Sequence, residues 1–271
     1  PIDLEKSGLT RDAVASFRQV WVTGCVSAYH VGVVAQYVLE DLAKIPVRVE
    51  LASEFRYRDP LVPENTLVVI ISQSGETADS LAALRKAKEQ GAKTLAIVNV
   101  VGSTIAREAD YVFYTLAGPE IAVATTKAYS AQLLAVYALA IAFAQDRGQL
   151  TDDQAAALVR ELESLPGKME RLLEDEARIQ WFASKQIAAK DIFFIGRGLD
   201  YAISLEGSLK MKEISYIHSE AYAAGELKHG TISLIEPGTL VVGVLTQQKL
   251  YEKTLSNLLE CKTRGAYLMA L

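Results

Sequence analysis

Residues 67–77 read L-V-V-I-I-S-Q-S-G-E-T, a β-branched apolar run that passes directly into a turn rich in hydroxyl groups. An amphipathic pattern follows, with Leu81, Leu84 and Lys88 at helical spacing. A strand, a polar turn and a helix start in this order are typical of an α/β protein, which builds anion pockets in this way. The stretch therefore predicts a sheet of buried strands flanked by helices.

The turn itself offers donors for the oxygens of a phosphate. Ser72, Ser74 and Thr77 supply hydroxyls, Gln73 supplies an amide, and Gly75 lets the backbone approach a ligand closely. The free N–H groups of the helix N-terminus point at the same place. Since the turn has no lysine or arginine, neutral donors and the helix dipole would hold the anion. A plain Ser/Thr cap of the helix is the alternative interpretation.

The composition describes a globular protein and excludes several function classes. The chain has 271 residues, 50% of them hydrophobic and 23% charged, enough for one large or two medium domains. A net charge of −5 argues against nucleic-acid binding through a basic face. The long uncharged run at residues 128–144 contains polar side chains and is too short for a bilayer, so we expect a core helix and no membrane partner.

The two cysteines indicate the compartment. Cys25 and Cys261 both lie in apolar segments and lack the spacing of metal ligands, so we expect buried thiols and no metal site. Buried thiols fit a reducing compartment, and no stretch at the start of the chain reads as a signal peptide. We therefore expect a cytoplasmic protein.

Strand-like and helical patterns alternate along the first half, which predicts a doubly wound parallel sheet. The expected strands are residues 20–23, 47–51, 67–71, 94–98 and 111–115, and the expected helices are residues 29–43, 78–90, 103–108 and 125–145. These elements make up a first domain at residues 1–149. A charge-rich helical connector with a break at Pro166 and Gly167 is expected at residues 150–189, and a second domain at residues 190–271.

The second domain repeats the first. The sequence T-L-V-V at residues 66–69 recurs at residues 239–242, and a one-residue slip then aligns Gly91 with Gly265. A duplicated α/β domain is expected, whose second copy is incomplete because it stops near the counterpart of Val98. The counterpart of the phosphate turn reads L-T-Q-Q-K-L and lacks the glycine and most hydroxyls, so one phosphate pocket is predicted.

A second region with chemical potential lies at the start of the second domain. Glu206, Lys210 and Glu213 are spaced i, i+4 and i+7, on one face of a helix. Such a face can hold a cation between two carboxylates and keep one carboxylate available as a base. A surface salt-bridge ladder is the alternative interpretation. The helix follows the G-R-G turn at residues 196–198, which places it at the carboxyl edge of the sheet, where α/β proteins bind ligands.

A histidine is the third candidate. His229 lies in the segment A-A-G-E-L-K-H-G at residues 223–230, between a lysine and a glycine, and is suited to proton transfer near neutral pH. An exposed or structural histidine is the alternative. His30 and His218 have fewer chemical neighbours in the sequence, and we expect both to be structural.

Four segments together resemble a known family. They are residues 52–58, 72–77, 209–217 and 221–230, and they are similar to the isomerase half of the glutamine–fructose-6-phosphate aminotransferases. That half consists of two tandem sugar-isomerase (SIS) domains. The resemblance therefore implies two SIS domains, each a doubly wound parallel sheet flanked by helices, over almost the whole chain.

The resemblance also implies a substrate site. In this family the S-Q-S-G-E-T turn binds the sugar phosphate, here through Ser72, Gln73, Ser74 and Thr77. The sugar itself is expected to contact three further residues, Ser27, Val123 and Thr125.

The resemblance assigns the reacting groups as well. Glu213 is implied to move a proton between C1 and C2 of the sugar, with Lys210 and Glu206 in support. His229 is implied to serve ring opening from the neighbouring subunit of a homodimer. The overall reaction makes glucosamine 6-phosphate from fructose 6-phosphate and ammonia, which an N-terminal glutaminase domain releases from glutamine. Neither a cofactor nor a metal is implied.

Two departures from the family pattern stand out. The turn at residues 25–28 reads C-V-S-A where the family usually has C-G-T-S, and Thr125 stands where the family often has serine. The family's glutaminase domain and C-terminal tail are not in this sequence, so we expect it to bind sugar phosphate but to catalyse poorly. The alternatives are a deglycase or deaminase of the same domain family, acting on fructosamine 6-phosphates, and a non-catalytic SIS sensor of sugar phosphates.

Overall fold

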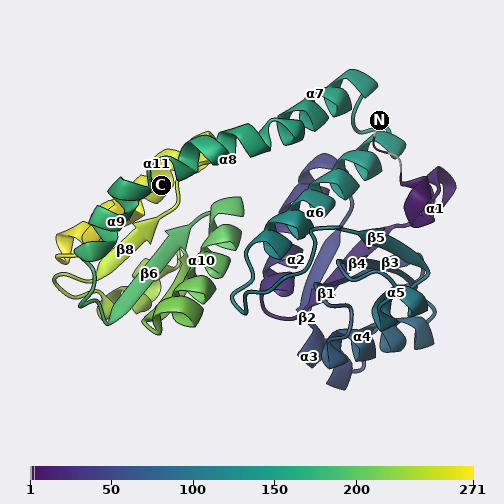
Figure 1. Cartoon of the computed structure of the whole chain (residues 1–271), viewed down its shortest axis with the longest axis horizontal. Helices are drawn as coiled ribbons and strands as arrows, with labels where there is room; N and C mark the ends of the chain where they lie inside the picture. Colours follow the sequence, from purple (N-terminus) through teal and green to yellow (C-terminus); the bar gives the residue numbers. More distant parts are fainter. Residues whose placement is uncertain (1, 3) are drawn as a thin grey trace. The chain divides into compact units, whose positions relative to one another are not determined.

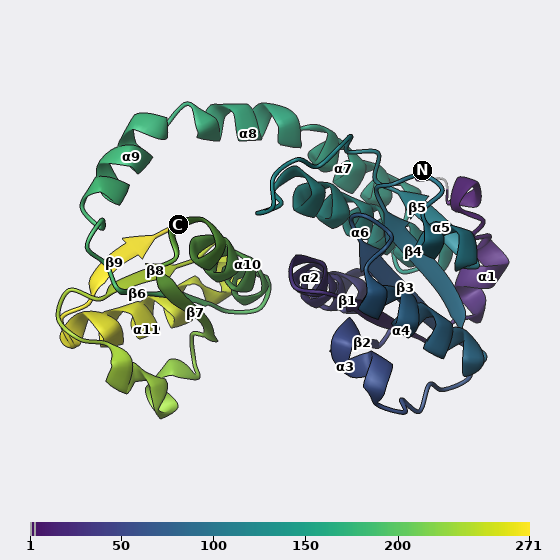
Figure 2. The same cartoon turned by 60° about the horizontal axis from the view of Figure 1, so that its bottom comes forward.

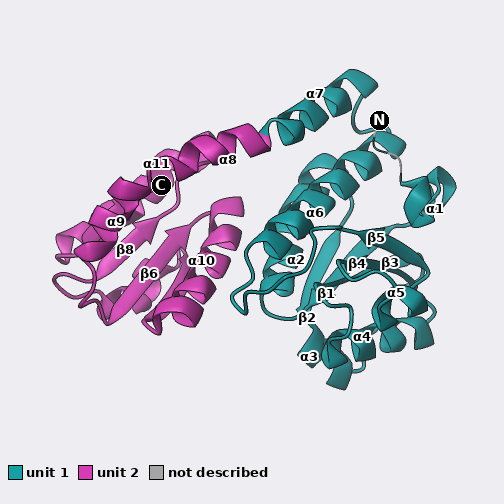
Figure 3. Ribbon diagram, in the orientation of Figure 1, with its two compact units in different colours: residues 1–164 teal, residues 165–271 magenta. Residues whose placement is uncertain are grey.

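The computed structural model describes residue 2 and residues 4–271. These residues form two compact units, one up to Ser164 and one from Leu165 to Leu271 (Figure 3). Each unit is a parallel sheet with helices on both faces (Figures 1 and 2). The expected α/β fold class is therefore confirmed.

The described part of the first unit contains a five-stranded parallel sheet in the order β2-β1-β3-β4-β5. The strands are β1 (Gln19–Gly24), β2 (Val47–Leu51), β3 (Thr66–Ser72), β4 (Lys93–Val98) and β5 (Tyr111–Tyr114). β3 is buried along its whole length, which explains its continuous apolar sequence. The strand order changes direction between β1 and β3, and α/β proteins bind ligands at such a switch point.

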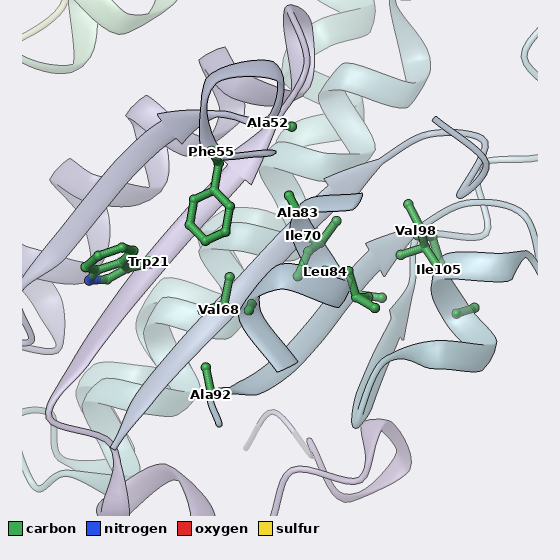
Figure 4. Packing of buried hydrophobic residues seen from close by; sticks show 13 residues of the cluster. Trp21, Ala52, Phe55, Val68, Ile70, Ala83, Leu84, Ala92, Val98 and Ile105 are labelled. Atoms are coloured by element: carbon green, nitrogen blue, oxygen red, sulfur yellow. The ribbon is translucent and has the colours of Figure 1, made fainter. Parts of the chain in front are cut away.

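Helices cover both faces of this sheet (Figure 2). The long helices α2 (Ser27–Leu42) and α6 (Lys127–Asp146) pack together on one face. The other face carries α3 (Ala52–Tyr57), α4 (Ala78–Glu89) and α5 (Thr104–Glu108). Between these helices and the strands lies an apolar core that includes Trp21, Phe55 and Leu84 (Figure 4). The described part of the unit contains three further helices: η1 (Glu5–Ser7), α1 (Arg11–Ser16) and α7 (Asp152–Glu163).

The second unit repeats this plan with four parallel strands among the described residues, in the order β7-β6-β8-β9. The strands are β6 (Asp191–Gly196), β7 (His218–Ala223), β8 (Leu240–Gly243) and β9 (Tyr267–Ala270). The helices are α8 (Leu165–Leu173), α9 (Glu176–Ser184), α10 (Leu199–Ser215), η2 (Leu227–His229), η3 (Thr231–Leu234), η4 (Gln248–Leu250) and α11 (Tyr251–Thr263). Since β8 occupies the place of β3, the duplication predicted from the sequence is confirmed.

Several elements differ from the sequence-based expectation, including three regular helices and strands and the short helices η1–η4. β7, α1 and α3 were not predicted from periodicity. β7 reads H-S-E-A-Y-A and is an edge strand with partly exposed side chains, so it has no apolar run to reveal it.

The expected connector at residues 150–189 contains α7, α8 and α9. The boundary between the two compact units falls inside it, after Ser164. Pro166 and Gly167 lie in the first turn of α8, where proline is tolerated because the first N–H groups of a helix have no partner within it. The domain limits at residues 149 and 190 stay a prediction.

α6 is the one helix of the described chain that is long and apolar enough to cross a membrane by length and composition. Most of that apolar stretch is buried inside the first unit. This burial agrees with the core helix expected at residues 125–145.

Candidate functional site

The S-Q-S-G-E-T turn connects β3 to α4 at the switch point of the first sheet. Two of its hydroxyls are fixed by contacts within the turn. Ser72 Oγ accepts the Gly75 N–H at 3.1 Å and lies 3.2 Å from Thr77 Oγ1. Ser74 Oγ accepts the Glu76 N–H at 3.2 Å. The turn thus has a defined shape before any ligand binds.

Thr77 occupies the N-cap position of α4, but its side chain makes no capping hydrogen bond to the helix. Its hydroxyl lies beside Ser72 instead. The plain-cap interpretation of the turn requires that capping bond. Because the capping bond is absent from the described α4, the Thr77 hydroxyl lies beside that of Ser72 instead. These two neighbouring hydroxyls favour the anion-binding interpretation.

Gly75 is required for two separate reasons. Its φ of +67° lies in the left-handed region, and a Cβ atom built on it would stand 2.0 Å from Ser103 Oγ. The neighbouring Glu76 carboxylate accepts the Thr104 N–H at 2.7 Å at the start of α5. This bond, together with the Thr104 hydroxyl, holds the pKa of Glu76 below its usual range. The turn is therefore fastened to the connection between β4 and α5.

Gln73 faces a groove at the carboxyl edge of the first sheet. The groove has a volume of about 460 Å³, and Asn99, Leu116 and Glu120 are among its lining residues. Asn99 shapes it because its Oδ1 accepts the Ala117 N–H at 2.7 Å and its Nδ2 donates to the Gly118 carbonyl at 2.7 Å. A groove next to a phosphate turn can take the rest of a small ligand.

The three residues expected to contact the sugar lie in three different settings. Ser27 is buried at the start of α2, directly after Val26, which adopts a φ of +51° that β-branched residues rarely adopt. Thr125 Oγ1 donates to Glu120 at 2.9 Å, so it is tied to a residue of the groove. Val123 is 97% exposed and does not line that groove.

In the second unit, α10 brings together the three charged residues that the sequence placed on one face. Lys210 Nζ lies 3.3 Å from Glu206 Oε1 and 2.5 Å from Glu213 Oε2. The Glu206 side chain is 7% exposed, that of Lys210 is 17% exposed and that of Glu213 is 30% exposed. A surface ladder would expose all three, so the salt-bridge alternative does not describe this group. Glu206 anchors the lysine from inside, and Glu213 remains open to a ligand.

His229 ends η2 and is exposed, and within the described residues its ring has no hydrogen-bonding partner. The buried side chain of Leu227 anchors the same segment. Arg197 packs against Gly225, where a Cβ atom would stand 2.9 Å from Arg197 Nη2, and Nη2 also donates to Asn257 Oδ1 at 2.9 Å. The histidine is thus exposed on a segment that the buried Leu227 side chain and Arg197 hold against the rest of the unit.

Three residues that position the site were not predicted as site residues from the sequence: Asn99, Glu120 and Arg197. Asn99 and Arg197 each come directly after a strand, which was an available signal for a binding-edge residue. Glu120 had no such signal, because its contact with Thr125 forms inside an irregular segment.

The thiols are poor candidates for chemistry. Burial raises the pKa of the Cys25 thiol, an effect that the Ser80 hydroxyl partly offsets. Burial also raises the pKa of Cys261, to about 11. Both thiols are therefore protonated at neutral pH and weakly nucleophilic. Among the residues described, no group of three or more His, Cys, Asp or Glu side chains could hold a metal ion.

The family model described as the SIS domain matches residues 14–142 and 187–271. This chain belongs to the SIS-domain family. The chain is 54% identical over 269 residues to a glutamine–fructose-6-phosphate aminotransferase (isomerizing) of Caldanaerobacter subterraneus subsp. tengcongensis. That match covers 99% of this chain and 44% of the relative, so the chain spans less than half the length of the relative.

Solved structures agree. This SIS chain is 41% identical to the C-terminal domain of glucosamine-fructose-6-phosphate aminotransferase from Francisella tularensis, with a TM-score of 0.94 over 96% of this chain and 73% of that one. The predicted resemblance to the isomerase half of these enzymes is thereby confirmed. A glucosamine-6-phosphate deaminase from Thermotoga maritima shares the fold alone, with a TM-score of 0.75 at 24% identity over 98% of this chain and 82% of that one.

Proposed function

We propose that this chain is the sugar-phosphate isomerising portion of a glutamine–fructose-6-phosphate aminotransferase. The observation that carries the proposal is the Glu206–Lys210–Glu213 group, in which one carboxylate is buried and the other is open to a ligand. A surface salt-bridge ladder has no need of such asymmetry, whereas an acid–base site needs one fixed and one accessible carboxylate. The identity of 54% to an aminotransferase of this name supports the same assignment.

In the proposed reaction, ammonia adds to the C2 carbonyl of open-chain fructose 6-phosphate and water leaves. The Glu213 carboxylate then takes a proton from C1 and returns it to C2, while the proton of the C1 hydroxyl moves to the imine nitrogen. These two transfers leave an aldehyde at C1 and an amine at C2. Lys210 fixes the orientation of Glu213 through the 2.5 Å contact, and Glu206 fixes Lys210 at 3.3 Å. A carboxylate held in one orientation transfers a proton more effectively than a mobile one.

The phosphate is proposed to bind at the S-Q-S-G-E-T turn. Its donors are the hydroxyls of Ser72, Ser74 and Thr77 and the amide of Gln73. The preformed hydrogen bonds of Ser72 and Ser74 with backbone N–H groups support this assignment. Ser27, Val123 and Thr125 are proposed to contact the sugar.

The relatives' greater length supports one of the partner assignments, an additional domain in the full-length protein. We propose that an N-terminal glutaminase domain supplies ammonia in the full-length protein and that the protein is a cytoplasmic homodimer. His229 is proposed to open the sugar ring of the neighbouring subunit, and its exposed position on η2 suits that role. Residues 1–149 and 190–271 are proposed as the two SIS domains, with a helical connector between them.

The decisive experiment replaces Glu213 by Gln in the full-length protein. Loss of the base is expected to lower the rate of glucosamine 6-phosphate formation by about 10²–10⁴-fold. Binding of fructose 6-phosphate, measured by calorimetry, is expected to persist. Glu252→Gln is the matched control, since Glu252 is an exposed carboxylate at the start of α11. An unchanged rate in Glu213→Gln would overturn the proposal and favour a non-catalytic sensor.

A further inference from the structure

The first turns of α2 and α10 occupy corresponding places in the two sheets. β1 and β6 each end in a glycine that packs against the first turn of the next helix. A Cβ atom built on Gly24 would stand 2.8 Å from Ala28 Cβ, and one built on Gly196 would stand 2.5 Å from the carbonyl carbon of Asp200. Asp200 is therefore the counterpart of Ala28.

The residues that precede the two helices support this equivalence. Val26 has φ 51° and ψ −112°, and Gly198 has φ 57° and ψ −126°, and each is the N-cap of its helix. An unusual backbone conformation thus recurs two residues before Ala28 and two residues before Asp200.

The Asp200 carboxylate fills the loop that follows β8. Asp200 is 2% exposed, and both of its carboxylate oxygens have donors from that loop. Thr246 Oγ1 donates to Oδ1 at 2.5 Å, while the N–H groups of Thr246 and Gln247 donate to Oδ2 at 3.1 and 3.4 Å. The donors of this loop are therefore already bonded to an acceptor that belongs to the chain itself.

The corresponding loop of the first unit has the same backbone donors but no such acceptor. Gly24, the last residue of β1, pairs with Ile71. In the second unit Ile195, one residue before the corresponding Gly196, pairs with Gly243, so Val244 is the counterpart of Ile71. Counting on from there, Thr246 and Gln247 correspond to Gln73 and Ser74. At the position of Asp200, α2 has Ala28, whose methyl side chain cannot accept a hydrogen bond. In the described chain the backbone N–H groups of Gln73 and Ser74 have no acceptor.

We infer that Asp200 is a built-in substitute for phosphate in the second unit, and that the residue at this helix position decides which unit binds a ligand phosphate. The small side chain of Ala28 leaves the first loop open, whereas the carboxylate of Asp200 closes the second. The inference deepens the proposed function and rests on it for the identity of the first unit's ligand. It also gives a physical reason for one phosphate site in a duplicated fold.

The test measures how many inorganic phosphate ions bind to the 271-residue chain by isothermal titration calorimetry. The natural chain is expected to bind one phosphate, and Asp200→Ala is expected to bind two. Asp200→Asn is the matched control: its side-chain oxygen can accept the two N–H groups and its amide can donate to the Thr246 hydroxyl. That variant is expected to remain at one phosphate. A folded Asp200→Ala protein with one site would overturn the inference.

A reciprocal variant decides the matter if Asp200→Ala does not fold. Ala28→Asp places a carboxylate against the phosphate turn and is expected to weaken phosphate binding about 100-fold, since like charges in contact repel strongly. Ala28→Asn has the same size without the charge and is expected to weaken binding less than tenfold. Unchanged affinity in Ala28→Asp would contradict the inference.

The two proposals fail in different ways. A second phosphate site in Asp200→Ala would support the substitution even if the full-length protein did not isomerise fructose 6-phosphate. Conversely, an active enzyme in which neither Asp200→Ala nor Ala28→Asp alters phosphate binding would refute the role of Asp200 and leave the proposed function intact.

Discussion

Gly75 is the residue on which the shape of the phosphate turn depends most directly. Its positive φ is unfavourable for residues that carry a side chain, and the nearby Ser103 leaves no room for a methyl group. Ser103 is itself 2% exposed, so it cannot move outward without disturbing the start of α5. A Cβ atom at position 75 would therefore be disfavoured both by the backbone conformation and by its contact with Ser103.

Gly75→Ala is expected to lower the free energy of unfolding by about 3 kcal/mol, because an unfavourable φ and overpacking both contribute. Gly91→Ala is the matched control: Gly91 has a φ of +80° but nothing within 4 Å of a built Cβ atom. It is expected to cost about 1 kcal/mol, the conformational part alone. Urea denaturation measures both values. Equal losses in the two variants would show that the Ser103 contact costs nothing.

At the scale of elements, Asp110 joins the starts of β4 and β5. Its carboxylate accepts the Thr94 N–H at 2.9 Å and the Thr94 hydroxyl at 2.8 Å, and Lys93 Nζ lies 3.6 Å away. Burial raises the pKa of Asp110, but the two hydrogen bonds and the nearby lysines outweigh burial and hold the pKa below its ordinary value. The carboxylate thus stabilises the edge of the sheet in its ionised form.

A depressed pKa in the folded state has a definite consequence for acid stability. The contribution of Asp110 is complete above the ordinary pKa of an aspartate and is lost as the pH falls through the lower, folded-state pKa. Asp110→Asn is expected to cost about 1–3 kcal/mol at pH 7. The difference between this variant and the natural chain is expected to shrink below pH 4, as urea denaturation across pH would show. A difference that did not change with pH would contradict the role of ionisation.

The elements were predictable where burial imposed an apolar sequence. β3 and β1 are buried on both faces, and their continuous apolar runs located the sheet and the phosphate turn correctly. β7 could not be found in this way because it lies at the edge of its sheet and alternates polar with small side chains.

Side-chain partnerships between distant segments were the least predictable feature. The helical spacing of Glu206, Lys210 and Glu213 indicated their contact, but not that Glu206 is nearly buried. The bond between Asp200 and Thr246 joins residues 46 positions apart, and no periodicity in the sequence reports it.

At the scale of the whole molecule, the two units carry different parts of the proposed chemistry. The phosphate turn belongs to the first unit, and the Glu206–Lys210–Glu213 group belongs to the second. Binding and proton transfer can therefore be removed independently by substitution.

Fructose 6-phosphate is expected to raise the melting temperature of the chain, since a ligand at 100 times its Kd adds about 2.7 kcal/mol to the folded state. The double variant Ser72→Ala with Thr77→Val is expected to lose this protection, whereas Glu213→Gln is expected to keep it. Thermal unfolding with and without the sugar phosphate measures each case. Full protection of the double variant would show that the turn does not bind the phosphate.

The complete burial of β3 also bears on how the chain is made in the cell. Residues 66–71 are uniformly apolar or β-branched and carry no charge. Such a segment is prone to cross-β association while its edges are unpaired. During synthesis β1 is available before β3 emerges, but β4 begins at Lys93, so one edge of β3 waits for a partner still to be translated. Slower aggregation at low expression temperature is the practical consequence.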